Sequence, residues 1–184
     1  MAYLFVHFRE MWTEKGEQVY FALSKNGYDW EIINDGNPVI TAKKGDLGVR
    51  DIVIARTRDN RFVIMATDLA LIKNIDTKYK GNIRNAFKDG SKAIAMWKSD
   101  DLVNWSDEIL LQFDDDNLGC FWAPGIFFDD GRAGELLTGE ILELGDAGKI
   151  LVNGIVDRTV GLEGFPIIAF ELEVQRPVGE TSEP

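Results

Sequence analysis

The sequence predicts an all-β fold, a partial β-propeller of four-stranded antiparallel blades. The main observation is a repeat: residues 19–30 and 94–105 both form a strand, a polar turn that begins with serine, and a tryptophan six residues later (30 − 24 = 105 − 99 = 6). The two copies are offset by 75 residues (99 − 24 = 75), and alternating apolar strands precede each of them. Four-stranded units that repeat along a chain are typical of propeller blades.

Each copy has the pattern of a β-hairpin, with a strand, a short polar turn and a second strand. The strands before the copies, at 3–8 and 61–67, are rich in β-branched and aromatic residues, which favour strands. The second unit is therefore predicted to contain four consecutive strands, at about 49–55, 61–67, 92–98 and 108–112.

The rest of the chain is less regular. The polar stretch 73–90 has little periodicity and is predicted to be an exposed loop, while residues 120–128 begin a third unit. Beyond it, 135–144 and 149–156 form a hairpin pattern around a Gly-rich turn, and 168–174 alternates like a half-buried strand. The sequence leaves three arrangements open for these strands: they complete the third blade, they close the edge of the second blade, or they form a separate sheet.

We therefore divide the chain into two parts. Residues 1–130 contain about two and a half propeller-like blades, and 131–184 form a β-rich C-terminal segment whose polar tail, from 176 onward, frays. Two and a half blades cannot close a ring, so strand edges and apolar faces would contact water. Self-association as a homo-oligomer is one remedy. The alternatives are that the C-terminal strands cap the open edge, or that the chain is a truncated gene product.

Composition excludes several classes of partner. The chain has 184 residues, of which 45% are hydrophobic and 28% charged, as in soluble globular proteins. Its formal net charge of −11 repels phosphate backbones and anionic lipids. We expect no nucleic-acid partner and no membrane partner, whereas neutral carbohydrates are not excluded.

Single occurrences of cysteine and histidine limit the chemistry further. Cys120 is the only cysteine and His7 the only histidine, so an intrachain disulfide and a histidine-rich metal site are both excluded. We expect no metal and no cofactor, and we expect Cys120 to be a buried small apolar residue. Residues 1–8 lack a signal-peptide pattern, which predicts a cytoplasmic location.

Six strings in the chain resemble, in order, those of the five-bladed propeller enzymes of glycoside hydrolase family 43, which cleave polysaccharides containing arabinose and xylose. The strings lie at 2–8, 20–30, 48–51, 66–69, 101–106 and 119–124, within roughly residues 2–129. The resemblance implies a central funnel, lined by the first strand of each blade, that carries three carboxylates. They are a general base, a modulator of the pKa of the acid, and a general acid, as an inverting hydrolysis requires.

Position by position, the resemblance supplies one carboxylate of the three. Asp51 in Val-Arg-Asp is similar to the modulator, although Ile52 replaces the proline that usually follows; the alternative is an aspartate that caps a strand end. The general acid normally follows Trp-Ala-Pro, where this chain has Gly125. The general base would lie on a strand before Tyr3, where the sequence shows only two residues. Loss of a general acid alone costs roughly 10²- to 10⁴-fold in rate.

Five further residues are predicted to contact sugar. Trp122 and Phe121 would stack on sugar faces in the funnel, as would Trp12, and His7 and Asp68 would supply polar groups; for each, packing in the core is the alternative. Trp30 and Trp105 are predicted to be structural because they occupy equivalent repeat positions.

These observations predict a truncated or degenerate relative of an arabinan- or xylan-cleaving hydrolase with little or no catalysis. One alternative is a non-catalytic carbohydrate-binding or assembly module. Another is an active glycosidase whose acid comes from Asp129, Asp130 or the run 114–116.

Overall fold

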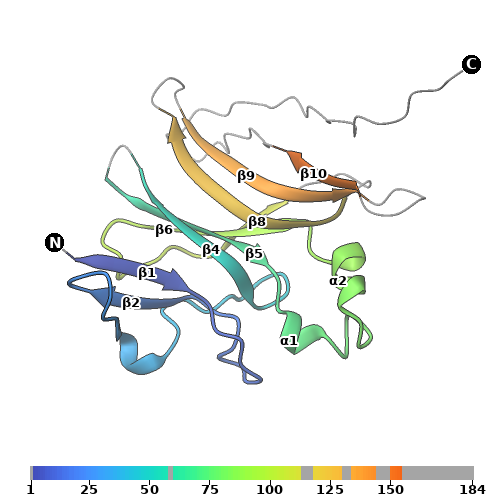
Figure 1. Cartoon of the computed structure of the whole chain (residues 1–184), viewed down its shortest axis with the longest axis horizontal. Coiled ribbons are helices and arrows are strands. Elements are labelled where there is room, and N and C mark those ends of the chain that lie inside the picture. Colours follow the sequence, from blue (N-terminus) through green and yellow to red (C-terminus); the bar gives the residue numbers. More distant parts are fainter. Residues whose placement is uncertain (1, 58–59, 113–117, 130–133, 144–149, 155–184) are drawn as a thin grey trace, which may run out of the picture.

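A computed structural model describes residues 2–57, 60–112, 118–129, 134–143 and 150–154. Within them the strands form three antiparallel sheets, stacked in chain order (Figure 1). The strands are β1 (Tyr3–His7), β2 (Tyr20–Ser24) and β3 (Glu31–Ile32) in the first sheet, β4 (Val49–Arg56), β5 (Phe62–Asp68), β6 (Ala93–Ser99) and β7 (Ile109–Gln112) in the second, and β8 (Leu118–Asp129), β9 (Gly134–Glu143) and β10 (Ile150–Gly154) in the third. The predicted all-β class is confirmed, and the four strands of the second unit lie within two residues of their predicted bounds.

The third sheet decides between the alternatives for the C-terminal strands. β9 pairs with β8 from Asp129 opposite Gly134, and β10 pairs with β9 from Ile150 opposite Glu143. These two strands therefore extend the sheet that begins with β8, and the division of the chain at residue 130 stays a prediction. The predicted strand at 168–174 and the tail from 176 lie outside the described residues.

The stretch 73–90 was predicted to be a loop, and this was wrong. It contains the second half of α1 (Leu71–Asn74) and the whole of α2 (Ile83–Asp89). The residue before α2 is an asparagine whose side chain accepts a hydrogen bond from the N–H two residues later. Tyr79 and Ala86 are fully buried, in a small cluster with Leu69. The prediction failed because these apolar contacts are tertiary and too few to give the sequence a helical period.

One short 3₁₀ turn, η1 (Asn34–Gly36), follows β3. No helix in the described part of the chain is long and apolar enough to cross a membrane.

The 75-residue repeat extends to the hydrogen bonds of the two hairpin turns. The hydroxyl of Ser24 accepts from the backbone N–H groups two and three residues on, at 3.3 and 2.8 Å. The hydroxyl of Ser99 does the same, at 3.2 and 2.9 Å. A serine at the end of a strand thus organises both turns, because its oxygen satisfies two N–H groups that the hairpin leaves free.

The second polar residue of each turn also matches. Asn26 and Asp101 stand 75 positions apart (101 − 26 = 75), and the Oδ1 atom of each accepts from the N–H groups two and three residues on, at 2.7 to 2.9 Å. Hydrogen bonds from the backbone and side chain of Asn104 are the main reason why the pKa of Asp101 is well below its ordinary value. The repeat is therefore one turn structure built twice.

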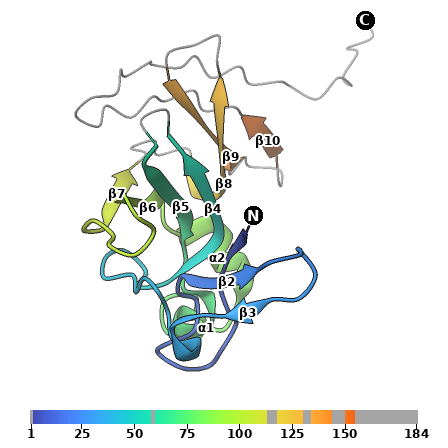
Figure 2. The same cartoon turned by 90° about the vertical axis from the view of Figure 1, so that its left-hand side faces the viewer.

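The sheets pack face to face through two apolar clusters. On β5, Ile64 and Ala66 face the first sheet, whereas Val63 and Met65 face the third. Because both faces of the second sheet are covered, its central strands are apolar at nearly every position. Figure 2 shows the second sheet between the other two.

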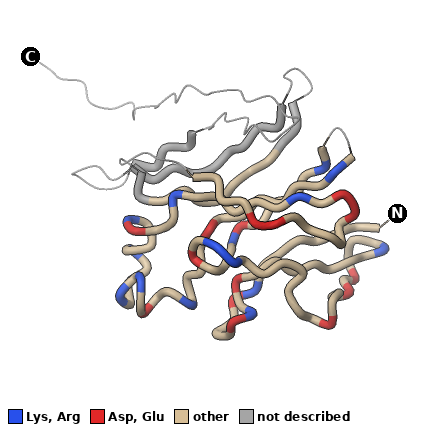
Figure 3. Tube along the Cα trace, turned by 180° about the vertical axis from the view of Figure 1, so that it is seen from behind, with Lys and Arg blue, Asp and Glu red and all other residues tan. Residues whose placement is uncertain are grey.

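Charged residues of both signs are interspersed along the described chain (Figure 3).

We expect Ser99→Ala to lower the free energy of unfolding by about 1 to 2 kcal/mol, because two backbone N–H groups lose their acceptor. Urea titration followed by circular dichroism measures the change. Lys25→Ala is the control, since Lys25 is exposed beside the equivalent serine of the first turn. Equal stability of Ser99→Ala and the unmodified chain would contradict the assigned role of the serine.

Candidate functional site

The first strands of the second and third sheets contain the same irregularity. On β4, Arg50 lies opposite Thr67 and Val53 opposite Met65, so three steps along β4 match two along β5 (53 − 50 = 3; 67 − 65 = 2). On β8, the pairs Trp122 with Glu140 and Gly125 with Thr138 show the same count (125 − 122 = 3; 140 − 138 = 2). Each strand therefore has one extra residue at this point, a β-bulge; β8 has a further register shift between Leu118 and Cys120. Bulges often lie next to active sites, where they redirect a side chain.

Asp51 and Ala123 occupy the same position in the two bulges. Their φ angles are 51° and 55°, in the left-handed region that residues other than glycine seldom adopt. Such a conformation costs of order 1 to 3 kcal/mol and persists only where the surroundings hold it. Both residues are exposed. The two strained positions thus present one carboxylate and one small apolar side chain to solvent.

One hydroxyl group joins the two bulges. The Oγ1 atom of Thr67 on β5 donates to Oδ2 of Asp51 at 3.0 Å and accepts from the backbone N–H of Ala123 at 2.9 Å. Thr67 is fully buried, so its hydroxyl group is shielded from solvent. The contact fixes the direction of the Asp51 carboxylate and the distance between the two strands.

Arg50 precedes Asp51 and is engaged elsewhere. Its guanidinium bonds Glu10 and Glu17, each at 2.7 Å, and lies over the ring of Phe8 at 5.1 Å. Two carboxylates compensate this charge, so Arg50 holds the segment after β1 against β4.

Glu17 is the centre of that attachment. It is only 2% exposed and also accepts from the backbone N–H groups of Leu71 and Ile72 at the start of α1, at 2.9 and 3.0 Å. Sequence reasoning missed both Glu17 and Thr67. Glu17 lies in none of the family strings, and Thr67 lies in the string 66–69 without any sign of its role, because the contacts that define these roles join residues 16 to 56 positions apart.

Trp122 is half-buried beside the second bulge. Its ring packs on Phe87 of α2, with ring centroids 4.7 Å apart, and it contacts the cluster around Tyr79. Its indole nitrogen is buried and has no hydrogen-bond partner within the protein. Among the described residues two other atoms share this state, on Trp105 and Glu108. The ring of Trp122 therefore connects the second bulge to α2.

Phe121 and Asp68 lie deeper than a sugar contact requires. Phe121 is 0% exposed and packs between the second and third sheets. Asp68 is 1% exposed, and its oxygens accept from the N–H of Asp46 at 2.8 Å and the hydroxyl of Ser91 at 2.5 Å. A Cβ at Gly45 would lie 2.1 Å from its carboxylate. We leave both residues out of the proposed binding surface.

Buried polar groups around Asp68 attach residues 71–89 to the second sheet. These residues contain α1 and α2, and we call them the helical insert. Burial raises the pKa of Asp68, and its hydrogen bonds partly offset that effect. Asp46 accepts from the hydroxyl of Tyr79 at 2.6 Å, and burial is also the main cause that raises the pKa of this tyrosine. Cys120 is buried nearby, as expected, and burial raises its pKa to about 12, so the thiol stays protonated at neutral pH.

His7 and Trp12 lie away from the bulges in the chain. His7 is half-buried on β1, stacked between Phe5 and Tyr20 with ring centroids 5.0 and 5.7 Å away. Trp12 is 76% exposed in the segment after β1. The structure brings only Asp51 and Trp122, of the predicted residues, to the joined bulges.

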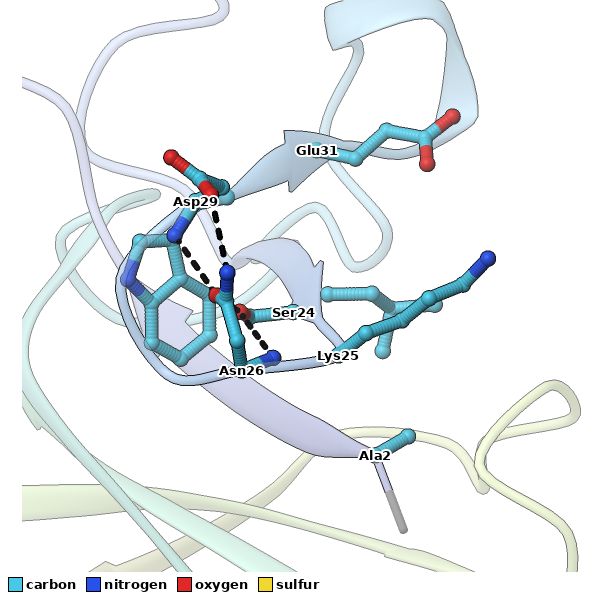
Figure 4. Close-up of a pocket in the computed structure, with 8 residues that line it drawn as sticks. Ala2, Ser24, Lys25, Asn26, Asp29 and Glu31 are labelled. Carbon is cyan, nitrogen blue, oxygen red and sulfur yellow. Dashed lines mark hydrogen bonds between the residues drawn. The ribbon is translucent and has the colours of Figure 1, made fainter.

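A shallow pocket of about 500 Å³ lies at the turn of the first hairpin (Figure 4). Leu23 and Trp30 supply its apolar wall, and Asn26 and Asp29 are bonded to each other at 2.8 Å across its polar side. The described residues contain no group of three or more histidine, cysteine, aspartate or glutamate residues able to hold a metal ion.

A protein-family model described as "Probable glycosyl hydrolase domain", the family related to glycoside hydrolase family 43, matches residues 1–137. The chain belongs to this family. The resemblance found in the sequence is thereby confirmed, and the match ends within β9 of the family 43-related domain. No curated protein matches the sequence.

One solved structure supports the fold of the family 43-related domain, and a second is reported beside it. The crystal structure of a "putative exo-beta-1,3-galactanase from Bifidobacterium bifidum s17" is 11% identical, with a TM-score of 0.50, over 82% of this chain and 47% of that chain. A "thermostable family-43 glycoside hydrolase" is 16% identical, with a TM-score of 0.45, over 84% and 48%. The chain spans about half the length of each of these structures.

Replacement of Thr67 by valine should lower the free energy of unfolding by about 1 to 3 kcal/mol, because Asp51 and the N–H of Ala123 both lose a buried partner. Thr67→Ser keeps the hydroxyl and is the control. Chemical unfolding of both variants measures the difference. If the valine variant is as stable as the serine variant, the hydroxyl does not hold the two bulges together.

Proposed function

We propose that the family 43-related domain binds carbohydrate at the joined bulges and has little or no glycosidase activity of its own. The observation that carries the proposal is Gly125. It stands two residues after Ala123, at the position where the Trp-Ala-Pro motif of the family is followed by the glutamate that acts as general acid. Glycine has no side chain to hold a proton, so the leaving oxygen of a glycoside would depart unprotonated.

The remaining carboxylate suits binding. Asp51 is exposed, and Thr67 fixes its direction through a hydrogen bond. A carboxylate held this way accepts hydrogen bonds from sugar hydroxyl groups without losing much side-chain entropy on binding. Trp122, half-buried in the second bulge, adds apolar ring surface.

An active enzyme with another acid is the competing function. Asp129 ends β8, six residues beyond Ala123 (129 − 123 = 6), which corresponds to roughly 20 Å along a strand. The two carboxylates of an inverting glycosidase lie about 6.5 to 9.5 Å apart. Asp129 is thus too far along the strand to act with Asp51; Asp130 and the run 114–116 lie outside the described residues. The geometry favours binding.

The sugar class is proposed from relatives. Family 43 resemblance favours arabinose- and xylose-containing oligosaccharides, and the galactanase with the similar fold adds β-1,3-linked galactose as a third probe.

We expect Asp51→Asn to weaken binding of the preferred oligosaccharide by about 10- to 100-fold, since a hydrogen bond to a charged group is worth about 1.5 to 3 kcal/mol. Isothermal titration calorimetry with the three oligosaccharide classes measures it. Asp100→Asn is the matched control, because Asp100 is exposed at the end of β6 far from Thr67 and makes the same charge change. Equal losses in both variants, or binding to no class, would refute carbohydrate binding at the bulges.

For catalysis, the comparison is between the unmodified chain and Gly125→Glu. We expect no release of 4-nitrophenol from aryl arabinofuranosides or xylosides by the unmodified chain. Turnover that appears only in Gly125→Glu would identify the site as a degraded active site. Clear turnover by the unmodified chain that is lost in Asp51→Asn would overturn the non-catalytic proposal.

A further inference from the structure

The helical insert has a charge opposite to that of the rest of the chain. Residues 71–89 contain five lysine and arginine residues and two aspartates, a net charge of +3 (5 − 2 = 3). The other residues contain 15 basic and 29 acidic side chains (20 − 5 = 15; 31 − 2 = 29), a net charge of −14 (15 − 29 = −14). In Figure 3 the part of the tube that contains α1 and α2 lies on the left, and blue positions prevail over red ones there. A local positive surface of this kind attracts anions.

Four of the five cations are not compensated by a neighbouring carboxylate. Lys78 is bonded to Asp46 at 2.5 Å. The other four are exposed, and within the described part of the chain none of them forms an ion pair. They are Lys73, Lys80, Arg84 and Lys88, which we call the basic surface.

Two of these cations stand on adjacent turns of α2. Arg84 and Lys88 are four residues apart, and like charges at this spacing repel each other slightly. Lys88 is in the last turn, where the helix dipole favours a cation, whereas Arg84 is in the first turn, where the dipole disfavours one. The first turn contains no acidic residue that would offset this effect. The helix therefore gains no stability from the charge of Arg84.

α2 lies against the second bulge. Phe87 packs on the ring of Trp122, which lies in that bulge, with ring centroids 4.7 Å apart. Just after the helix, the carbonyl oxygen of Ser91 accepts from the backbone N–H of Phe121 at 3.1 Å. Arg84 precedes Phe87 by three residues, so the two side chains are neighbours on the helix surface. The basic surface thus adjoins one of the two joined bulges.

The helical insert belongs to the middle sheet of the three. It connects β5 to β6 in the second sheet, which packs against the first sheet on one face and the third sheet on the other (Figure 2). The cations are therefore exposed beyond the ends of two covered strands, and not on an uncovered sheet face.

We propose that the site at the joined bulges binds an acidic polysaccharide, in which some sugar units are uronic acids, and that the basic surface binds the uronate carboxylates. This inference rests on the proposed carbohydrate binding at the bulges. Asp51 accepts hydrogen bonds from hydroxyl groups and repels anions, so neutral sugar units would lie there. A polymer that carries neutral units and uronates matches both surfaces at once.

The charge of the rest of the chain argues against other polyanions. A nucleic acid carries a phosphate at every nucleotide, so a bound strand would also meet the net charge of −14 outside the insert. Uronates can be separated by several neutral units, so that only one or two carboxylates need to reach the basic surface. Charges farther away than about 10 Å are largely screened at 0.1 M salt. The local positive charge then outweighs the negative charge of the rest of the protein.

Two forms of one oligosaccharide test the proposal on the full chain. They are a xylo-oligosaccharide with one glucuronic acid side group, and the same molecule after reduction of the carboxyl group to a primary alcohol. We expect the acidic form to bind at least about fivefold more tightly at pH 7 in 0.05 M NaCl, and we expect this preference to disappear in 0.5 M NaCl. Isothermal titration calorimetry measures both affinities.

Two substitutions assign the preference to the basic surface. Arg84→Gln and Lys88→Gln should each reduce the preference for the acidic form by about two- to fivefold and leave the affinity for the reduced form unchanged. Lys25→Gln is the matched control, because it makes the same charge change at an exposed residue in the turn of the first hairpin. Circular dichroism establishes that the variants fold.

The outcomes separate this inference from the proposed function. Equal affinity for the two forms, a preference that survives both substitutions, or an equal loss in Lys25→Gln would overturn the inference and leave carbohydrate binding intact. An oligodeoxythymidylate that binds as tightly as the acidic sugar would also overturn it, since the surface would then bind any polyanion. If neither form binds but a neutral oligosaccharide of another proposed class does, the inference alone fails. Binding of no oligosaccharide at all would refute the proposed function as well.

Discussion

The hydroxyl group of Thr67 is the contact on which the candidate site depends. It is the only side chain described here that bonds both bulges, and it does so from a fully buried position on β5. Because it donates to Asp51 and accepts from the backbone of Ala123, it sets where the carboxylate points and how β4 lies against β8. Two strained backbone positions are thereby held by one group, and the strain is distributed over two sheets.

That contact is possible because the second sheet is covered on both faces. Its apolar strands pack toward the first sheet on one side and toward Phe121 on the other, which brings the first strands of successive sheets next to each other. In this chain the arrangement places Asp51 in the bulge of β4 and Ala123 in the bulge of β8, with Gly125 two residues further on. The proposed loss of catalysis rests on that glycine, which has no side chain to hold a proton.

Strand positions could be predicted well from the sequence because they depend on local signals. The serine turns at Ser24 and Ser99 are fixed by hydrogen bonds over two or three residues, and the repeat makes them visible. The helical insert, Glu17 and Thr67 could not be predicted, because each acquires its role from partners far along the chain. Phe121 shows the same limit: an aromatic residue next to a motif suggests a ligand, yet whether its ring faces a funnel or a core depends on the packing of two sheets.

The site residues Asp51 and Trp122 were found only through the family motifs, and the bulges explain why those motifs exist. Val-Arg-Asp and Trp-Ala-Pro mark the same extra residue in β4 and β8, at Asp51 and Ala123. The alternation of apolar and polar residues along a strand gives no sign of a bulge. The register of neighbouring strands is what reveals that the two motifs are equivalent.

The most direct test of the central claim is a two-dimensional ¹H–¹⁵N NMR titration with the oligosaccharide that binds most tightly. Binding at the joined bulges predicts that the amide signals of Asp51, Thr67 and Ala123 shift together, with little change at the hairpin turn around Asn26, and that the oligosaccharide remains uncleaved in the same tube. Shifts centred on Trp30 and Asn26, or the appearance of shorter sugars during the titration, would contradict the account.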